Sequence, residues 1–437
     1  MTFHLNQISC EARCHPSHAL RLATLFGALA SAGSLFAQAA TNVPPLTLSS
    51  AVAIAVGNNS QLVSLRAKVQ AMKERPAQAS ALPNPMATYS GMDMADGGRW
   101  PDTREKRLMV QQEFPWFGKR DLRERIAAKD AEGAQRELEA ATLDIAMRVK
   151  ESFYDLSSVQ RVIAITREEQ DVIGRMVKIA QTQYATGSAS QGDAIKAQTE
   201  VTLLKQKLWE LQSQENTLKA KLNTLLNRRV DEPLAALEPP KDSGVAGDDA
   251  AQLFAEATKN RPEIRAAQTQ IERYELQKKL MEKEFYPDYK LGVEYRGKES
   301  EEDMVMFTVS VELPFWQSKY RAGVREAEKL REASQADRET AERQSALDVQ
   351  DAHFKLQTAR HMLALYRTEL IPQAQARFKA SEAGYRTGKS DFLDLLESER
   401  FLLNAKTMAA LTEGAVGAAT ARLERAVGAD VAHTKND

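Results

Sequence analysis

The stretch MVMFTVSVEL, residues 304–313, alternates between two kinds of side chain along its whole length. Every odd-numbered position carries Val, Phe or Leu, whereas the even-numbered positions include Thr, Ser and Glu. A period of two predicts a β-strand with one apolar face and one mixed face. The stretch YKLGVEYR, residues 289–296, alternates in the same way, and the polar segment KESEED between the two predicts a hairpin turn.

Both strands are about ten residues long, which is the length with which a β-strand crosses a membrane. A hairpin that is half-buried on a soluble core alternates in the same way, so the pattern alone leaves both alternatives open. In the membrane alternative, the apolar face contacts lipid. The residues assigned to that face are Tyr289, Leu291, Val293, Tyr295, Val305, Phe307, Val309, Val311 and Leu313.

The hairpin lies in the second of two similar halves. Four pairs of segments match in the same order, each pair about 200 residues apart. The pairs are SQLVSLRAKVQ with RPEIRAAQTQI, EFPWFGKR with ELPFWQSK, MRVKESFYDL with LDVQDAHFKL, and QYATGSASQGD with GYRTGKSDFLD. The shared order and offset indicate a tandem duplication. The matching strands of the first half are expected at Met86–Met94 and Arg104–Phe114.

Each half is expected to hold a helix, a β-hairpin and a long helical hairpin. Apolar residues three, four or seven positions apart in the long helices are typical of coiled-coil packing. The expected helices before the strands are Thr47–Ala79 and Asp249–Phe285, and the expected long helices are Lys119–Tyr184 and Lys319–Tyr385. The expected divisions are a signal peptide at 1–39, a first repeat at 40–230, a Pro-rich linker at 231–248, a second repeat at 249–428 and a C-terminal tail at 429–437.

The N-terminal segment has the features of an export signal. RLATLFGALASAGSLFAQAA, residues 21–40, has a basic start, an apolar run and small residues near its end. A membrane anchor is the alternative interpretation, although small and polar residues interrupt the run. Cleavage near Ala39 removes Cys10 and Cys14, which leaves no cysteine for a disulfide or a thiolate metal site. No later apolar run reaches the length of about 18 residues that a membrane helix needs.

Composition and motifs exclude several functions. The formal net charge is -1, so the basic excess expected for a nucleic-acid partner is missing. Residues 383–390 fit a relaxed phosphate-binding loop, A-x-x-x-x-G-K-S, but the residues before them are polar and helical, whereas that loop needs a preceding strand. No nucleophile and base stand at usable spacing. We therefore expect no enzyme, no cofactor and no resident metal.

Four strands cannot close a membrane barrel, because the smallest such barrels have about eight. If the hairpins span a membrane, several copies of the chain must assemble: two copies supply eight strands and three supply twelve. Trp100, Trp116 and Trp316 suit either an aromatic belt at the membrane interface or simple packing.

The whole pattern resembles the TolC family of outer-membrane efflux channels. The resemblance covers nearly the whole mature chain and rests on the duplication, on LPNP at residues 82–85, on the E-F/L-P-aromatic junctions at Pro115 and Pro314, and on the Y-x-T-G turns. It implies a homotrimer, mainly α, with a twelve-stranded barrel in the outer membrane and a tunnel of long helices in the periplasm. The chain departs from the lipidated members of the family, because no cysteine follows its apolar run.

The resemblance also implies function and partners. The channel is a passive exit duct in outer-membrane lipid, and it works with a periplasmic adaptor protein and an inner-membrane pump of the resistance-nodulation-division type. FPWFGKR, residues 114–120, resembles the branch that serves cobalt-zinc-cadmium and copper pumps, which makes heavy-metal cations candidate substrates. The rival hypothesis is a periplasmic coiled-coil adaptor, but an adaptor usually has one helical hairpin flanked by β-domains.

The turn between the last two helices is the candidate entrance. Gly388 is expected to end the long helix, and Asp391 to cap the next one with Asp394 three positions on. The resemblance adds that an Asp-x-x-Asp at this turn lines the periplasmic entrance, and Asp391 and Asp394 match it. Asp193 is the counterpart in the first half. In a trimer, such crowded carboxylates attract cations and raise one another's pKa.

Two further sets of side chains leave alternatives open. Met86, Met92 and Met94 suit either a soft-metal site or adaptable packing, of which packing is the commoner role. His353 and His361 lie eight residues apart on an expected helix without an acidic cluster nearby, which favours a packing or solvent role over metal ligation.

Overall fold

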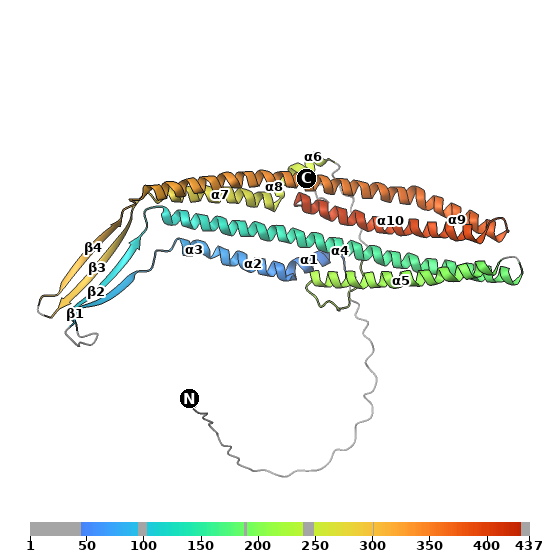
Figure 1. Cartoon of the computed structure of the whole chain (residues 1–437), viewed down its shortest axis with the longest axis horizontal. Coiled ribbons are helices and arrows are strands. Elements are labelled where there is room, and N and C mark those ends of the chain that lie inside the picture. The colour runs from blue at the N-terminus through green and yellow to red at the C-terminus, as the bar shows by residue number, and fades with distance from the viewer. Residues whose placement is uncertain (1–44, 95–102, 188–189, 239–248, 300, 430–437) are drawn as a thin grey trace, which may run out of the picture. The chain divides into compact units, whose positions relative to one another are not determined.

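The structure is a computed structural model that describes residues 45–94, 103–187, 190–238, 249–299 and 301–429. Helices make up most of these residues, and four strands form a single sheet (Figure 1). The expected signal peptide, both cysteines and Trp100 lie outside the described residues, as does most of the expected linker and tail. Of the described helices, none is long and apolar enough to cross a bilayer.

The two halves repeat one order of elements. The first half contains α1 (Leu48–Asn58), α2 (Ser60–Lys73), α3 (Arg75–Ala79), β1 (Met86–Met94), β2 (Thr103–Phe114), α4 (Lys119–Ala185) and α5 (Gln191–Leu225). The second contains α6 (Ala250–Asn260), α7 (Pro262–Lys283), β3 (Asp288–Lys298), β4 (Met304–Glu312), α8 (Gln317–Leu365), the π-helix η1 (Tyr366–Leu370), α9 (Ile371–Arg386) and α10 (Phe392–Val427).

The four strands form one antiparallel sheet in the order β1-β2-β3-β4. Its central pair joins β2 of the first half to β3 of the second, so the sheet needs both halves. Val110 pairs with Val293, and Val293 pairs with Phe307, which places apolar residues of three strands on one face. β1 and β4 are the edges of this sheet. Edge strands carry unpaired backbone groups, so a closed barrel requires β1 and β4 to pair with other copies of the chain.

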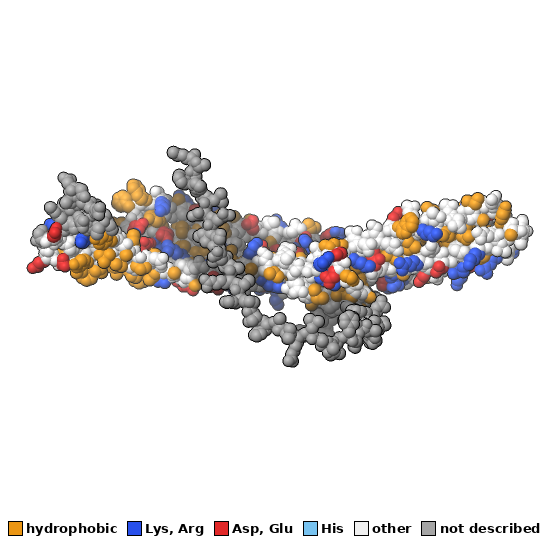
Figure 2. Space-filling model, turned by 90° about the horizontal axis from the view of Figure 1, so that it is seen from below, with side chains coloured by type: hydrophobic (Ala, Val, Ile, Leu, Met, Phe, Trp, Pro, Cys, Tyr) orange, Lys and Arg blue, Asp and Glu red, His pale blue; other side chains and the backbone are white. Residues whose placement is uncertain are grey.

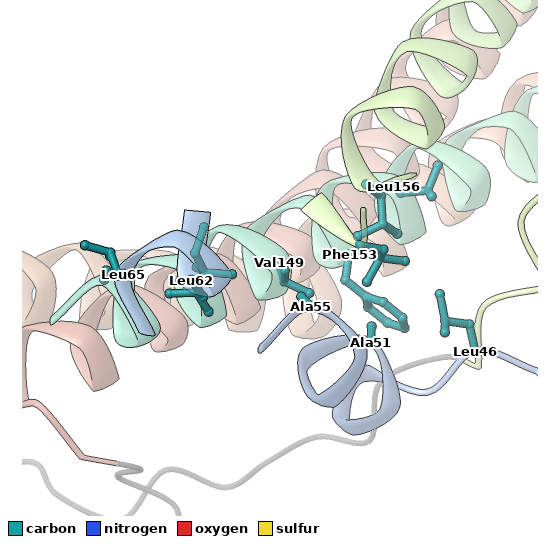
Figure 3. Close-up of a cluster of buried hydrophobic side chains, with 12 residues drawn as sticks. Leu46, Ala51, Ala55, Leu62, Leu65, Val149, Phe153 and Leu156 are labelled. Atoms are coloured by element: carbon teal, nitrogen blue, oxygen red, sulfur yellow. The ribbon is translucent and has the colours of Figure 1, made fainter. Parts of the chain in front are cut away.

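Helix α4 is the element around which the other helices pack. It contacts α1, α2, α3 and α7 along one part and α5 and α10 along the rest (Figure 1). Phe153 is fully buried in a cluster with Leu46 and Ala51 (Figure 3). The apolar residues of α4 that recur at three- and four-residue spacing are all buried, as coiled-coil packing predicts. They are Ile145, Val149, Phe153, Leu156, Val159 and Ile163.

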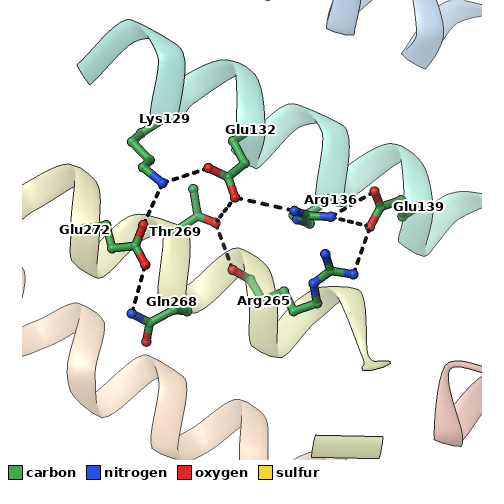
Figure 4. Close-up of polar contacts among 8 residues, drawn as sticks. All are labelled: Lys129, Glu132, Arg136, Glu139, Arg265, Gln268, Thr269 and Glu272. Atoms are coloured by element: carbon green, nitrogen blue, oxygen red, sulfur yellow. Dashed lines mark hydrogen bonds and ion pairs between the residues drawn. The ribbon is translucent and has the colours of Figure 1, made fainter. Parts of the chain in front are cut away.

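Ion pairs follow the line where α4 of the first half meets α7 of the second (Figure 4). Lys129 Nζ lies 2.8 Å from a carboxylate oxygen of Glu132 on its own helix and 2.6 Å from one of Glu272 on α7. Further along, Glu139 pairs with Arg136 at 3.0 Å and with Arg265 of α7 at 3.8 Å. Solvent reaches these pairs, so each contributes only about 0–1 kcal/mol to stability. The alternating signs of the charges mainly favour one register of the two helices.

Three of the predicted helices are interrupted, each for a local reason. The expected helix from Thr47 breaks at Asn59, whose side chain caps α2 by accepting from the Gln61 amide. The one from Asp249 breaks before Pro262, because proline disfavours helical geometry in the residue before it. The second long helix passes through the π-turn η1, close to Pro372, whose missing N–H removes a bond from the helical ladder.

Gly428 ends α10 in the left-handed region with φ of 79°, and a Cβ placed there would lie 3.1 Å from Cα of Arg261. We expect Gly428→Ala to lower the free energy of unfolding by about 1–2 kcal/mol, because it adds both backbone strain and a close contact. Thermal unfolding followed by circular dichroism measures this. Gly57→Ala is the matched control, since nothing lies within 4 Å of its added Cβ. Equal melting temperatures of the two variants would contradict the strained, closely packed backbone assigned to Gly428.

Candidate functional site

The two helix-turn-helix tips have the same local construction. Gly187 and Gly388 follow the ends of α4 and α9 with φ of 75° and 69°, which lets the chain reverse without a Cβ clash. Gly388 therefore ends its helix as predicted. Ser190 then caps α5 by accepting from the backbone amide of Asp193. Asp391 occupies the corresponding position before α10.

The capping prediction for Asp391 is wrong in one respect. Asp391 has the extended backbone of a capping residue, with φ of -80° and ψ of 154°, but its side chain accepts no capping hydrogen bond. It lines a cavity of about 430 Å³ instead. A carboxylate that does not cap its own helix is available to a ligand or to a neighbouring subunit.

The same cavity brings together residues from both halves of the chain. Asp193 of α5 and Asp391 both line it, with Gln183 of α4 and Tyr385 of α9 also in the wall. The Tyr385 hydroxyl is buried and has no hydrogen-bond partner. Its burial raises the pKa of Tyr385, and the negative charges of Asp193 and Asp391 raise it further, so the hydroxyl stays protonated. Arg386, Thr387 and Ser390 also line the cavity, so it combines two carboxylates with three hydroxyl groups and one guanidinium. Asp193 lies 3.4 Å from Lys196 of its own helix.

Asp394 has a different environment. One of its carboxylate oxygens accepts a hydrogen bond of 2.7 Å from the Ser381 hydroxyl, and the other lies 3.9 Å from Arg377. These contacts hold α10 to α9. Asp394 is not in the wall of the cavity that holds Asp193 and Asp391. The structure thus brings two of the three predicted acidic residues together within one chain, and the third lies one helical turn away.

Of the nine residues predicted to face lipid, those in β3 and β4 all lie on one face of the sheet, and Leu313 follows the last residue of β4. Eight of the nine, all except Tyr289, are exposed, with Phe307 exposed by 79% and Leu313 by 72%. Hydrophobic side chains gather over this part of the molecule in Figure 2. Charged residues occupy the opposite face, where Glu105 pairs with both Arg107 and Arg296, and Lys290 pairs with Glu113. Such a division suits lipid on one side and water on the other.

The FPWFGKR motif builds the junction between sheet and helices. The Lys119 ammonium is only 2% exposed, and it donates to Glu284 at 3.1 Å, to the Tyr286 carbonyl at 3.1 Å and to Asp288 at 2.9 Å. Asp288 also accepts from the Trp116 amide at 2.6 Å. Trp116 stacks on Tyr286, which favours packing over an interfacial belt for this tryptophan, whereas Trp316 is exposed by 73%. Lys119 of the first half thus binds residues at the start of β3 in the second half.

Sequence reasoning missed a buried pair of carboxyl groups between α4 and α10. Glu169 is 3% exposed and Glu399 2%, and the two side chains share a hydrogen bond. Each keeps a buried oxygen without a partner. Burial first, and then the neighbouring Glu399, raises the pKa of Glu169 to about 9. A glutamate is usually exposed, so its residue type did not predict burial here. The one signal in the sequence is that Glu169 falls at helical spacing from the buried apolar residues of α4.

No group of three or more metal-ligating side chains gathers among the described His, Cys, Asp and Glu residues. His353 is buried against Phe354, and His361 is exposed, so the structure does not bring the two histidines to one site.

The sheet has one apolar face and two open edges, and paired long helices continue from it to a tip whose cavity holds Asp193 and Asp391. These features define one subunit of a membrane duct, and several copies of the chain are needed to complete the duct. The chain belongs to the outer membrane efflux protein family, whose model matches residues 52–228 and 253–429, one match in each half. It is thus part of an outer-membrane efflux channel with a periplasmic helical tunnel, and it acts as a passive channel and not as an enzyme.

Known proteins support this membership. The chain is 24% identical to the cobalt-zinc-cadmium resistance protein CzcC of Cupriavidus metallidurans, over 83% of this chain and 85% of that protein. It is 23% identical to the pyoverdine export outer membrane protein OpmQ of Pseudomonas aeruginosa, over 78% of this chain and 72% of that protein. The solved structure of CusC superposes with a TM-score of 0.75 at 16% identity, covering 87% of this chain and 92% of CusC.

The predictions of family and fold class are confirmed by these matches. The fold is mainly α, with tandem helical hairpins and with four strands per chain for the barrel of a trimer. Channels of this family work with an adaptor and an inner-membrane pump, which sets aside the rival hypothesis that this chain is itself the adaptor.

Proposed function

We propose that this chain is the exit duct for heavy-metal cations, which an inner-membrane pump of the resistance-nodulation-division type delivers through its adaptor. The observation that carries the proposal is the tip cavity, in which Asp193 and Asp391 from the two halves face one space. The similarity to a cobalt-zinc-cadmium resistance protein favours metal cations over other substrates. The nine strand residues assigned to lipid anchor the duct, and nucleic acid has no role.

The chemistry of the tip follows from carboxylate crowding. Asp391 and Asp394 supply two carboxylates per chain, and therefore six in a trimer whose tips meet around one axis. Rings of carboxylates at a constriction attract cations and repel anions. A cation that leaves the adaptor thus meets a surface of opposite charge at the start of the tunnel. The polar contacts of Asp394 with Ser381 and Arg377 position α10 for this role.

Replacing the tip carboxylates tests the entrance. We expect Asp391→Asn with Asp394→Asn to weaken block of the channel by Cd²⁺, added on the periplasmic side, by at least about tenfold, because the charges that hold the ion are lost. Single-channel recording in planar bilayers measures the block. Asp171→Asn is the control, an exposed aspartate on α4 away from the tip. Unchanged block in the double variant would remove these residues from the entrance.

Substrate class is tested in cells. We expect deletion of the chain to lower tolerance to Co²⁺, Zn²⁺ or Cd²⁺ several-fold and to leave export of organic siderophores unchanged. Loss of siderophore export is the alternative result to look for, because a pyoverdine export protein is also similar to this chain. Unchanged metal tolerance with loss of siderophore export would replace the metal proposal by an organic substrate.

A further inference from the structure

One face of the sheet carries methionine as its only hydrophobic residue type among the described side chains. Strand register places Met86 opposite Gln111, Met92 opposite Glu105, and Met109 opposite Thr88. Met304 pairs with Arg296, and Met306 pairs with Glu294. Alternate residues of a strand share a face, so all five methionines lie on the face of the Glu105 ion pairs. The remaining side chains described there are charged, amide or hydroxyl groups, or Gly292.

Packing does not account for these methionines. Met86, Met92, Met304 and Met306 are between 41% and 61% exposed, although they share their face with charged groups. Val, Leu, Phe and Tyr are gathered on the opposite face, which is the one assigned to lipid. A need for apolar volume on the water side would be met equally well by those residues. The selection of thioethers alone therefore points to a property of sulfur.

The register also brings three of the methionines to one place. Glu294 of β3 has Met109 of β2 as its partner on one side and Met306 of β4 on the other. Neighbouring strands lie about 4.8 Å apart, so two long thioether side chains flank one carboxylate within a span of about 10 Å. Met86 is the diagonal neighbour of Met109, because its partner Gln111 lies two residues along β2. The set offers three sulfur atoms and one carboxylate, and that carboxylate also lies 3.8 Å from the Arg107 guanidinium.

We propose that this thioether face, defined by Met86, Met92, Met109, Met304 and Met306, binds soft metal ions of the Ag⁺ and Cu⁺ class inside the barrel. Thioether sulfur prefers such ions over hard or borderline cations. Repeated weak sites along a wall let an ion enter and leave, as conduction requires. This inference rests on the proposed export of metal cations and names the class of metal that the barrel favours.

The test uses the purified trimer in planar bilayers, in potassium nitrate to keep silver soluble. Silver nitrate is the probe, and the readout is the concentration that halves the potassium current. We expect Met109→Leu with Met306→Leu to raise that concentration at least about tenfold, because leucine keeps the apolar volume and removes the sulfur. Met362→Leu with Met408→Leu is the matched control, since both methionines are exposed on helices outside the sheet.

Each outcome has one meaning. Equal silver sensitivity in the strand variant and the wild type overturns the thioether site, and so does block by Zn²⁺ at the same concentration as by Ag⁺. Potassium conductance without silver is expected to be the same in all variants, which shows that the leucine channels fold and assemble. The cellular test of metal tolerance is a separate measurement, so loss of the thioether site leaves the metal export proposal standing. Silver block that depends on the methionines, together with unchanged metal tolerance, would instead overturn metal export and with it the transport role of the thioether face.

Discussion

Lys119→Met is expected to lower the free energy of unfolding by about 3–5 kcal/mol, because it removes the cation from a buried ion-pair network. The ammonium of Lys119 is buried, and it is the shared donor to Glu284, to Asp288 and to the Tyr286 carbonyl. Methionine fills a similar volume but offers no donor. Glu284 and Asp288 then lie without the Lys119 cation between them, and the Tyr286 carbonyl loses this donor.

Thermal unfolding followed by circular dichroism measures this loss, and the fraction of trimer that survives unheated gel electrophoresis measures its effect on assembly. Lys178→Met is the matched control, because Lys178 is exposed on the same helix. We expect the control to melt like the wild type and the Lys119 variant to lose both stability and trimer. Wild-type stability in Lys119→Met would show that the junction depends on the stacking of Trp116 on Tyr286 and not on the ion pairs.

Glu169→Gln is expected to remove a pH dependence from the stability of the helical region. In the folded chain the pKa of Glu169 lies near 9, compared with 4.5 for the free side chain. Between these values the folded state keeps a proton that the unfolded state releases. The stability contributed by the protonated form is therefore fully present below about pH 4.5 and is lost as pH rises toward 9, by up to about 1.4 kcal/mol per pH unit.

Melting temperatures between pH 5 and pH 9 test this directly. We expect the wild type to lose stability steadily across that range and Glu169→Gln to show a much flatter profile, because glutamine stays neutral and still donates to Glu399. Glu168→Gln is the control, since Glu168 is exposed beside it on α4. Equal slopes in the wild type and the Glu169 variant would mean that the buried pair does not govern the response. Because the pair joins α4 to α10, we expect its ionisation to weaken the contact between the two halves of the chain.

Much of this protein was predictable from local sequence patterns. Alternation in residues 289–296 and 304–313 identified the strands, since a half-exposed strand places successive side chains on opposite faces. Three- and four-residue spacing identified the buried stripe of α4 for the corresponding helical reason. Gly187 and Gly388 identified the tips, because a helix that reverses needs a residue that tolerates positive φ.

Other features depended on contacts between residues far apart in the chain. The pairing of β2 with β3, the partners of Lys119 and the burial of Glu169 against Glu399 each join one half to the other. No local period encodes such contacts, because they are set by how the two halves pack. The face shared by Met109 and Met306 likewise appears only once the register across three strands is known. Sequence by itself thus determined the elements, the duplication and the positions of the two turns. The tertiary structure decided which charged and sulfur-containing side chains meet, since those energies depend on proximity and burial.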